Sequence, residues 1–218
     1  MITSHHNPKL KELRRIARRD ETRFVAEGED LLAAADAAGW PALERYVAGE
    51  NVEAEALAKV SQLGSGTRAI GVYERRWAEQ PTGPLCVALW GVHDPGNVGT
   101  VLRSALAFGA STVAIGPETA DPYGPKAVRA SMGAVFSVPL ARVATVDELP
   151  GERVALVAHE GQPLRGRTAG TVVVGAERTG LADEVVAACD RIAHIPIASE
   201  SLNAAMAATI ALYELTRP

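Results

Sequence analysis

The stretch LCVALWGVHDPGNVGTVLRSALAF, residues 85–108, decides the fold class of this 218-residue chain. Its first part, Leu85–Trp90, is an apolar run typical of a buried strand, and Val101–Phe108 carries a helical apolar pattern. Five further apolar runs follow it: Thr112–Gly116, Val135–Leu140, Val154–Ala158, Thr171–Gly175 and Arg191–Ile197. Apolar strands that alternate with helical stretches predict an α/β fold, with a mostly parallel sheet covered by helices on both faces.

The residues before this stretch predict a second, smaller α/β unit. Apolar residues at helical spacing follow Pro8, which suits the first turn of a helix. The expected elements are helices over residues 8–19, 27–38 and 53–62 and strands over residues 45–48 and 67–72. The segment Gln80–Pro84 has the proline and glycine content of a linker. The predicted organisation is a small α/β domain over residues 1–79, a linker over 80–84 and a larger domain over 85–218.

Composition narrows the class of protein. The chain is 47% hydrophobic and 22% charged, which is typical of a globular protein. Cys86 and Cys189 lie far apart in apolar surroundings, which favours reduced thiols in a cytoplasmic protein over a disulfide. The five histidines include no pair at the spacing of helical metal ligands, so we expect no metal. No apolar run approaches the roughly 20 residues of a membrane helix, so we expect no membrane partner.

Positive charge is concentrated in the first predicted helix. Residues 1–23 carry seven lysines and arginines against three acidic residues, whereas the whole chain has a net charge of −4. The cations are Lys9, Lys11, Arg14, Arg15, Arg18, Arg19 and Arg23. Clustered cations on an acidic protein are typical of a local phosphate-binding surface. From this segment alone, a solvated helix face fits at least as well.

Three short clusters hold glycines and polar residues suited to a ligand site: Asn97-Val98-Gly99 with Arg103, Gly175-Ala176-Glu177 with Gly180-Leu181, and Ile195-Pro196 with Ser201-Leu202-Asn203. Each cluster follows or ends an apolar run and precedes a helical stretch. All three would therefore gather at one end of a parallel sheet, where open α/β folds bind ligands. Taken singly, Arg103 fits an ordinary surface arginine and Glu177 a helix cap. Ser201 and Asn203 are common caps for the helix expected over Ser201–Thr216.

Together and in this order, the clusters resemble the three motifs of the SpoU (TrmH) family, RNA ribose 2′-O-methyltransferases of the SPOUT superfamily. The matching residues are Asp94-Pro95-Gly96-Asn97 with Gly99 and Arg103, Gly175 and Glu177 with Gly180-Leu181, and Ile195-Pro196 with Ser201-Leu202-Asn203 and Tyr213-Glu214. Asp121-Pro122-Tyr123 and Lys126–Ala134 are similar to the family's middle segment. The N-terminal part, with Asn7-Pro8 and Arg23–Gly28, resembles the substrate-binding domain of ribosomal RNA members.

The resemblance implies a C-terminal trefoil knot that forms a pocket for S-adenosylmethionine (AdoMet), and a homodimer whose active site draws on both subunits. It implies an RNA substrate, with ribosomal RNA favoured over transfer RNA and 23S rRNA favoured most. The implied cofactor-binding residues are Val174, Gly175, Ile195, Pro196 and Leu202. The implied catalytic residues are Asn97, Arg103, Glu177, Ser201 and Asn203. The RNA-binding candidates are Lys9, Lys11, Arg14, Arg15, Arg18 and Arg129.

A methyltransferase of this kind has to activate a ribose hydroxyl, which is a poor nucleophile near neutral pH. Its catalysis therefore depends on alignment and assisted deprotonation. We expect Arg103, near the RNA phosphate and the target 2′-hydroxyl, to position that hydroxyl and help remove its proton. A guanidinium is too basic to act as a simple base, so electrostatic assistance or a phosphate relay is the easier route. Asn97 and Ser201 are expected to fix the surrounding loops.

Other functions stay open from the sequence. The loop between Pro196 and Ser201 is shorter than the family pattern, which fits an RNA-binding protein of the same fold without methyl transfer. A transfer RNA 2′-O-methyltransferase also fits the three motifs. Glu118 follows the first glycine turn at the spacing of a ribose-binding acid, which points to a nicotinamide-dependent oxidoreductase. The third glycine of that dinucleotide site is missing, and this makes the oxidoreductase the weakest of the three.

Overall fold

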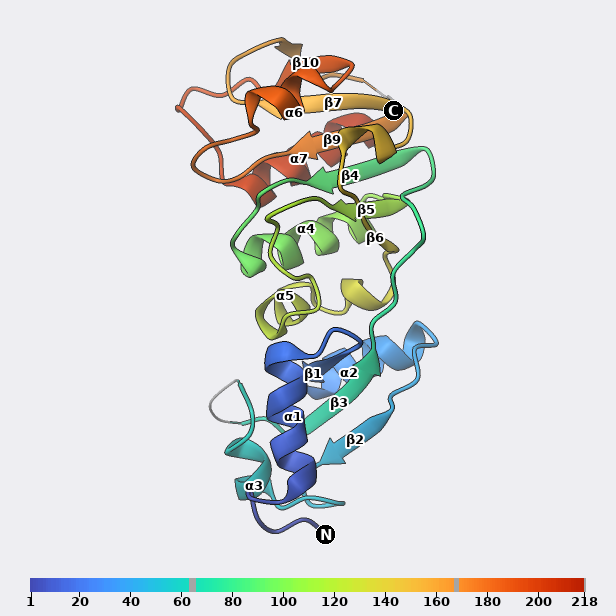
Figure 1. Ribbon diagram of the computed structural model, residues 1–218, viewed down its shortest axis with the longest axis vertical. Coiled ribbons are helices and arrows are strands. Elements are labelled where there is room, and N and C mark those ends of the chain that lie inside the picture. Colours follow the sequence, from blue (N-terminus) through green and yellow to red (C-terminus); the bar gives the residue numbers. More distant parts are fainter. Residues whose placement is uncertain (63–65, 167–168, 218) are drawn as a thin grey trace.

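The computed structural model describes residues 1–62, 66–166 and 169–217, and its two sheets follow one another along the long axis of the molecule (Figure 1). Of the predicted domains, residues 63–65, 167–168 and Pro218 lie outside the described residues. The smaller sheet lies toward the N-terminus and the larger sheet contains the remaining strands. Among the described helices, none is both long and apolar enough to cross a membrane.

The larger sheet has seven strands in the order β6-β5-β4-β9-β7-β10-β8, and every strand pair in it is parallel. Its strands are β4 (Leu85–Leu89), β5 (Thr112–Ile115), β6 (Leu140–Arg142), β7 (Glu152–Val157), β8 (Gln162–Pro163), β9 (Gly170–Val174) and β10 (Arg191–His194). Every residue of β4, β5 and β9 is buried, as expected for central strands covered on both faces. The predicted parallel α/β fold is confirmed.

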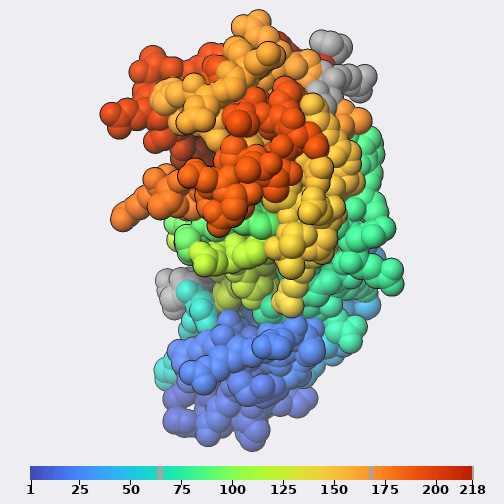
Figure 2. Space-filling view, turned by 45° about the horizontal axis from the view of Figure 1, so that its top comes forward, coloured from blue at the N-terminus to red at the C-terminus, as the bar shows by residue number. Residues whose placement is uncertain are grey.

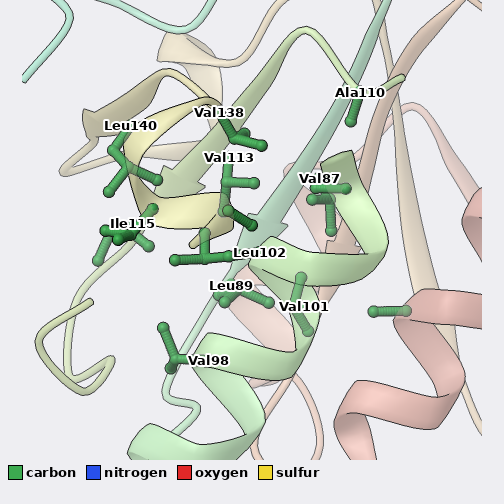
Figure 3. Packing of buried hydrophobic residues seen from close by; sticks show 14 of the residues in the cluster. Val87, Leu89, Val98, Val101, Leu102, Ala110, Val113, Ile115, Val138 and Leu140 are labelled. Carbon is green, nitrogen blue, oxygen red and sulfur yellow. The ribbon is translucent and has the colours of Figure 1, made fainter. Parts of the chain in front are cut away.

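Alternating side chains of the central strands form two separate cores. On one face, Val87 and Leu89 of β4 pack with Val101 and Leu102 of α4 (Pro95–Ala107), as Figure 3 shows. The helix α7 (Ala204–Thr216) contributes to the same core. On the other face, Ala88 belongs to a core that includes residues of α6 (Asp183–Ala187). Helices therefore cover both faces, while the trefoil knot implied by the resemblance stays a prediction.

The smaller sheet is antiparallel, with strand order β1-β3-β2. The elements around it are α1 (Pro8–Arg19), β1 (Arg23–Glu27), α2 (Glu29–Ala37), β2 (Glu44–Val47), α3 (Ala54–Ala58) and β3 (Ala69–Glu74). Asn7 caps α1 by accepting a hydrogen bond from the Lys9 amide at 3.0 Å, and Pro8 occupies the first turn. The apolar face of α1 packs on this sheet through Leu10, Leu13 and Ile16, so the basic face of the helix is turned outward.

An aromatic cluster joins the smaller sheet to the segments on either side of α5 (Pro125–Ala130). The Phe24 ring of β1 lies 4.8 Å from the Tyr123 ring, and the Tyr73 ring of β3 lies 5.0 Å from the Phe136 ring, centroid to centroid. The buried Tyr123 hydroxyl accepts a hydrogen bond from the Arg76 amide at 3.2 Å and donates one to the Arg76 carbonyl. These residues belong to one continuous core, so the small unit is packed firmly against the large one.

The strand predicted over Val135–Leu140 is wrong in position. Residues Ala134–Phe136 form a 3-10 helix instead, and strand β6 begins only at Leu140. Gly133 precedes the helix with φ of +92°, a conformation that breaks an extended run, and the apolar Val135 and Phe136 are buried in the aromatic core. Their hydrophobicity reflects this packing and not a strand.

Several predicted boundaries also change. Strand β1 was not predicted, and its last residue Glu27 displaces the start of α2 to Glu29. The helix α4 begins at Pro95 and not at Val101, because Asp94 accepts a hydrogen bond from the Gly96 amide at 2.6 Å and caps the helix. The first cluster therefore lies in the first turns of α4. Similarly, α3 is shorter than predicted and α7 starts after Asn203.

Candidate active site

The three sequence clusters meet at the carboxyl edge of the larger sheet. Parallel strands β4, β9 and β10 end at Leu89, Val174 and His194, and each cluster follows one of these ends. Asn97 lies in the first turn of α4, while Asn203 directly precedes α7. The strand order brings β4 and β9 side by side, so the clusters become neighbours although they are far apart in sequence.

Three side chains, one from each cluster, form a hydrogen-bonded chain that we call the three-motif link: Asn97, Glu177 and Asn203. The Asn97 amide nitrogen donates to the Glu177 carboxylate at 2.7 Å, and the Asn203 amide nitrogen donates to the Asn97 amide oxygen at 3.0 Å. The Asn203 oxygen accepts from the amides of Ala205 and Met206 at 3.0 and 3.2 Å. The link ends in an acceptor, the Glu177 carboxylate, and in donors, the backbone amides of α7. Only one placement of the nitrogen and oxygen in each asparagine side chain therefore satisfies every hydrogen bond.

Asn203 has two structural roles in this arrangement. It caps α7, and it also connects that helix to α4 through Asn97. Glu177 caps no helix, since Ala182 precedes α6 and the Glu177 carboxylate receives the Asn97 amide. A second contact supports the same pair of helices, because Ser104 of α4 and Thr209 of α7 share a hydrogen bond of 2.6 Å. The geometry of the link thus depends on how α4 and α7 pack.

A cleft of about 450 Å³ opens beside this link. Six of the predicted site residues line it: Val174, Gly175, Glu177, Ile195, Ser201 and Leu202. Pro196, Asn97, Arg103 and Asn203 are not among its lining residues. Sequence reasoning missed the lining residues at the end of β7, Leu156, Val157 and Ala158, because an ordinary apolar strand end carries no polar signal. It also missed Arg178, Thr179 and Glu200 at the cleft.

Two glycines shape the loop that carries Glu177. A Cβ added at Gly175 would lie 2.5 Å from the Gly180 oxygen, far inside van der Waals contact. Ala176 and Gly180 exchange two backbone hydrogen bonds of 3.1 and 3.0 Å, and Gly180 has φ of +68°. This conformation favours glycine. The pair therefore closes a tight turn that holds the backbone of Glu177 beside the cleft.

The cleft is suited to AdoMet. Its volume is in the range of small-molecule sites, and apolar side chains from three strand ends, Leu156, Val174 and Ile195, can cover an adenine ring. The carboxylates Glu177 and Glu200 also line the cleft, where negative charge favours a cationic ligand such as a sulfonium. The backbone approach allowed by Gly175 adds amide and carbonyl groups at the same wall.

Arg103 lies on α4 but away from the cleft lining. Its side chain is exposed and makes no hydrogen bond or ion pair with any other residue that the structure describes. The start of its helix is fixed, because Lys126 of α5 lies 2.9 Å from the capping carboxylate of Asp94. This contact, together with the Gly96 amide, lowers the pKa of Asp94. Arg103 is therefore a cation on a well-anchored helix, with its charge uncompensated by the part of the chain that the structure describes.

The predicted RNA-binding cations divide into two groups. Arg15 pairs with Glu12 and Asp20, and Arg14 donates to the Lys59 carbonyl, so these two are engaged within the protein. Hydrogen bonds from Arg15 and Arg23 lower the pKa of Glu12 to about 2. The predicted cations with exposed side chains and no partner among the described residues are Lys9, Lys11, Arg18 and Arg129. Only this second group is free to contact phosphate.

Outside this site, histidine, acidic and cysteine side chains are the groups that metal binding or thiol catalysis would need. Among the described residues, no group of three or more His, Cys, Asp and Glu side chains is placed to hold a metal ion. Cys86 and Cys189 are free thiols, and burial raises the pKa of Cys189 to about 11. A thiol with a pKa in this range is almost entirely protonated at neutral pH and is a weak nucleophile.

Comparisons with known proteins agree with this fold. Residues 84–213, more than half of the chain, match the model of the SpoU rRNA Methylase family. The crystal structure of an AdoMet-bound rRNA methyltransferase from Sinorhizobium meliloti superimposes with a TM-score of 0.88 at 30% identity, over 98% of this chain and 96% of that one. The Bacillus subtilis 23S rRNA (guanosine(2553)-2′-O)-methyltransferase RlmP is 27% identical over 98% of both chains.

A further relative is the 23S rRNA (uridine(2479)-2′-O)-methyltransferase of Streptomyces viridochromogenes, which is 36% identical over 56% of this chain. The alignment spans 49% of that relative's length. The AdoMet-bound structure of the SpoU methyltransferase AviRb, also from S. viridochromogenes, has a TM-score of 0.80 over 97% of each chain. With a parallel sheet, three converging motifs and a family match over most of the larger sheet, the chain belongs to the SpoU rRNA methylase family.

Proposed function

We propose that this chain transfers a methyl group from AdoMet to a ribose 2′-hydroxyl of RNA, most specifically of 23S rRNA. The observation that carries the proposal is the three-motif link at a cleft suited to AdoMet. The names of the relatives support the reaction and the substrate, since RlmP and the S. viridochromogenes enzyme are 23S rRNA 2′-O-methyltransferases. The proposed location is the cytoplasm, where ribosomal RNA is found and where free thiols stay reduced.

The chain's own residues would hold AdoMet along one side of the cleft. Val174, Ile195 and Leu202 provide apolar surface, and Gly175 lets the backbone approach closely. The bound cofactor supplies an activated methyl group on a sulfonium. Pro196 lies outside the lining, so its proposed role is to direct the loop that carries Ser201 and Leu202. The pocket is proposed to belong to the trefoil knot.

Residues beside the cleft are proposed to activate the 2′-hydroxyl. The guanidinium of Arg103, which has no partner among the described residues, is available to an RNA phosphate that can take up the proton of the 2′-hydroxyl. It would also stabilise the negative charge that develops on the hydroxyl oxygen. Asn97 keeps α4, and with it Arg103, in place relative to Glu177. Because the Glu177 carboxylate already accepts the Asn97 amide, we assign Glu177 a positioning role. The exposed hydroxyl of Ser201 can donate to a ligand in the cleft.

The small unit over residues 1–79 is proposed to bind the RNA at a distance from the cleft. Figure 2 shows the N-terminal residues at one end of the molecule and the C-terminal residues at the other. The free cations of α1 lie at the former end and the cleft at the latter. An RNA that contacts both regions must extend from one end of the molecule to the other. The aromatic core fixes the two contact regions relative to each other.

Replacing Lys9, Lys11 and Arg18 together with alanine should weaken RNA binding and flatten its salt dependence. Each lost phosphate contact should reduce the slope of log K against log [salt] by about 1. The affinity for AdoMet should not change, because the three residues are far from the cleft. Titration of labelled rRNA fragments at several salt concentrations measures the slope. Arg68→Ala, on the same unit, is the control, and an unchanged slope in the triple variant would refute the assignment.

A homodimer is proposed from the outer surface of α4 and α7. Leu106 of α4 and Met206 and Tyr213 of α7 are 48%, 58% and 51% exposed, although α7 buries its alanines against the sheet. Tyr213 also contacts the ring of Phe108, with centroids 6.1 Å apart. Large apolar side chains grouped on packed helices are typical of an interface. A second copy on this face would lie next to Arg103.

The double variant Leu106→Glu/Tyr213→Glu should be monomeric and inactive. Two buried carboxylates would oppose association, because their desolvation is not compensated by a partner. Size-exclusion chromatography with light scattering gives the mass, and methyl transfer gives the activity. Leu43→Glu introduces the same charge at a residue that is 51% exposed on the small unit, and it should remain dimeric and active. A wild-type protein that is monomeric at working concentration would contradict the proposal.

The reaction itself is tested with methyl-labelled AdoMet and separate pools of unmodified ribosomal and transfer RNA. Alkali cannot cleave next to a 2′-O-methylated ribose, so label in alkali-resistant dinucleotides from the rRNA pool is the expected result. Label from the tRNA pool alone would refute the substrate assignment. No label from either pool, together with no AdoMet binding, would favour an RNA-binding protein without methyl transfer.

A further inference from the structure

One hydrogen bond beside the cleft joins two loops that are distant in sequence. The Nε2 atom of His159, which follows β7, lies 2.9 Å from the backbone oxygen of Glu200. A carbonyl can only accept, so this nitrogen carries the proton. Ala158, beside His159, lines the cleft, and so do Glu200 and its neighbour Ser201. The bond therefore joins two walls of the cofactor cleft.

The turn that carries His159 is firmly attached to β10. An added Cβ at Gly161 would lie 2.5 Å from the Ile192 carbonyl carbon, so the turn packs directly on the strand. The Leu164 amide donates to the His194 oxygen at 2.8 Å, and Leu164 is 2% exposed. The His194 ring also lies 3.3 Å from the Glu160 oxygen. The His159 side chain thus belongs to a turn that is held against β10.

The opposite wall, the loop over residues 195–202, has little else to hold it. Among the described residues, the loop makes one internal hydrogen bond, from the Ser199 hydroxyl to the Ser201 oxygen at 3.2 Å. The contact with His159 is the only hydrogen bond from this loop to the rest of the described chain. Beyond the loop, Asn203 is fixed by the three-motif link and by α7. Ser201 and Leu202 lie between these two attachments.

We propose that His159 is a positioning residue that holds the loop over residues 195–202 against the cleft and thereby strengthens AdoMet binding. The inference rests on the proposed function. Without the hydrogen bond, the loop samples open conformations, and binding must then order it at an entropic cost. The effect appears in cofactor affinity and not in the chemical step, since His159 touches no catalytic residue.

The test compares His159→Ala with His159→Gln, whose amide nitrogen can donate to the same carbonyl. Calorimetric titration with S-adenosylhomocysteine should give a Kd about three- to tenfold higher for the alanine variant, as expected for one exposed hydrogen bond. The glutamine variant should recover most of the affinity. Gln162→Ala is the matched control, because the exposed Gln162 side chain lies on the same turn and makes no hydrogen bond with any other described residue. At saturating AdoMet, kcat should be the same in all variants.

Digestion with a glutamate-specific protease tests the loop without any cofactor. His159→Ala should speed cleavage after Glu200, measured relative to cleavage after the exposed Glu79, and His159→Gln should not. Equal affinity and equal cleavage in wild type and His159→Ala would overturn the inference, as would an equal effect of Gln162→Ala. A wild-type protein that does not bind S-adenosylhomocysteine would count against the proposed function instead, while the digestion would still decide the role of His159.

Discussion

Arg103→Ala should lower kcat for RNA methylation by about two to three orders of magnitude, the usual effect of removing a group that stabilises transition-state charge. The reason is that Arg103 has no partner among the described residues, so its charge is available to the substrate. The Kd for AdoMet should stay within about twofold of wild type, because Arg103 does not line the cleft. Steady-state kinetics and calorimetric titration measure the two quantities separately.

Two controls make this result specific. Arg165→Ala removes another exposed arginine of the larger sheet's unit and should leave kcat unchanged. Arg103→Lys keeps the charge but loses the planar fork of donors, so it should recover only part of the activity. If Arg103→Ala keeps near-normal turnover, the assignment is wrong. If the loss appears only as weaker RNA binding, Arg103 binds phosphate and takes no part in activating the hydroxyl.

The sequence predicted the parts of the fold that depend on local pattern. The apolar runs at Leu85–Trp90 and Thr171–Gly175 became β4 and β9, because a strand buried on both faces needs apolar residues at nearly every position. The convergence of the three clusters was also predictable, since parallel strands end at the same edge of a sheet. Non-local packing was not predictable in the same way. Val135 and Phe136 are apolar because of the aromatic core, which only the folded chain brings together.

At the site, the residue types were predictable but the partners were not. Nothing in the sequence indicates that Asn97 joins Glu177 to Asn203, because the bonds connect residues that are 80 and 106 positions apart. The same limit applies to the basic helix. Its pattern of cations does not reveal that Arg15 is engaged by Glu12 and Asp20. The place of Leu156 in the cleft wall is likewise a property of the assembled sheet.

The three-motif link predicts a pH-dependent defect in Asn97→Asp. A second carboxylate would replace the amide that now donates to Glu177 at 2.7 Å, so two like charges would face each other in a half-buried site. This raises the pKa of the pair in the folded state, which then binds more protons than the unfolded state. Stability is therefore lost as pH rises through the raised pKa. We expect a deficit of about 2 kcal/mol in the free energy of unfolding at pH 8.

At pH 5 a single proton shared between the introduced carboxylate and that of Glu177 would restore a hydrogen bond, and the deficit should fall to less than half. Urea denaturation at both pH values measures the difference. Asn97→Ala provides the comparison, because it removes both bonds of Asn97 without adding charge, and its deficit should be about 1 to 2 kcal/mol at either pH. A deficit of Asn97→Asp that does not change between pH 5 and pH 8 would mean that the Glu177 carboxylate is not held against residue 97 in solution. The link would then not be the element that keeps α4 and its Arg103 aligned with the cleft.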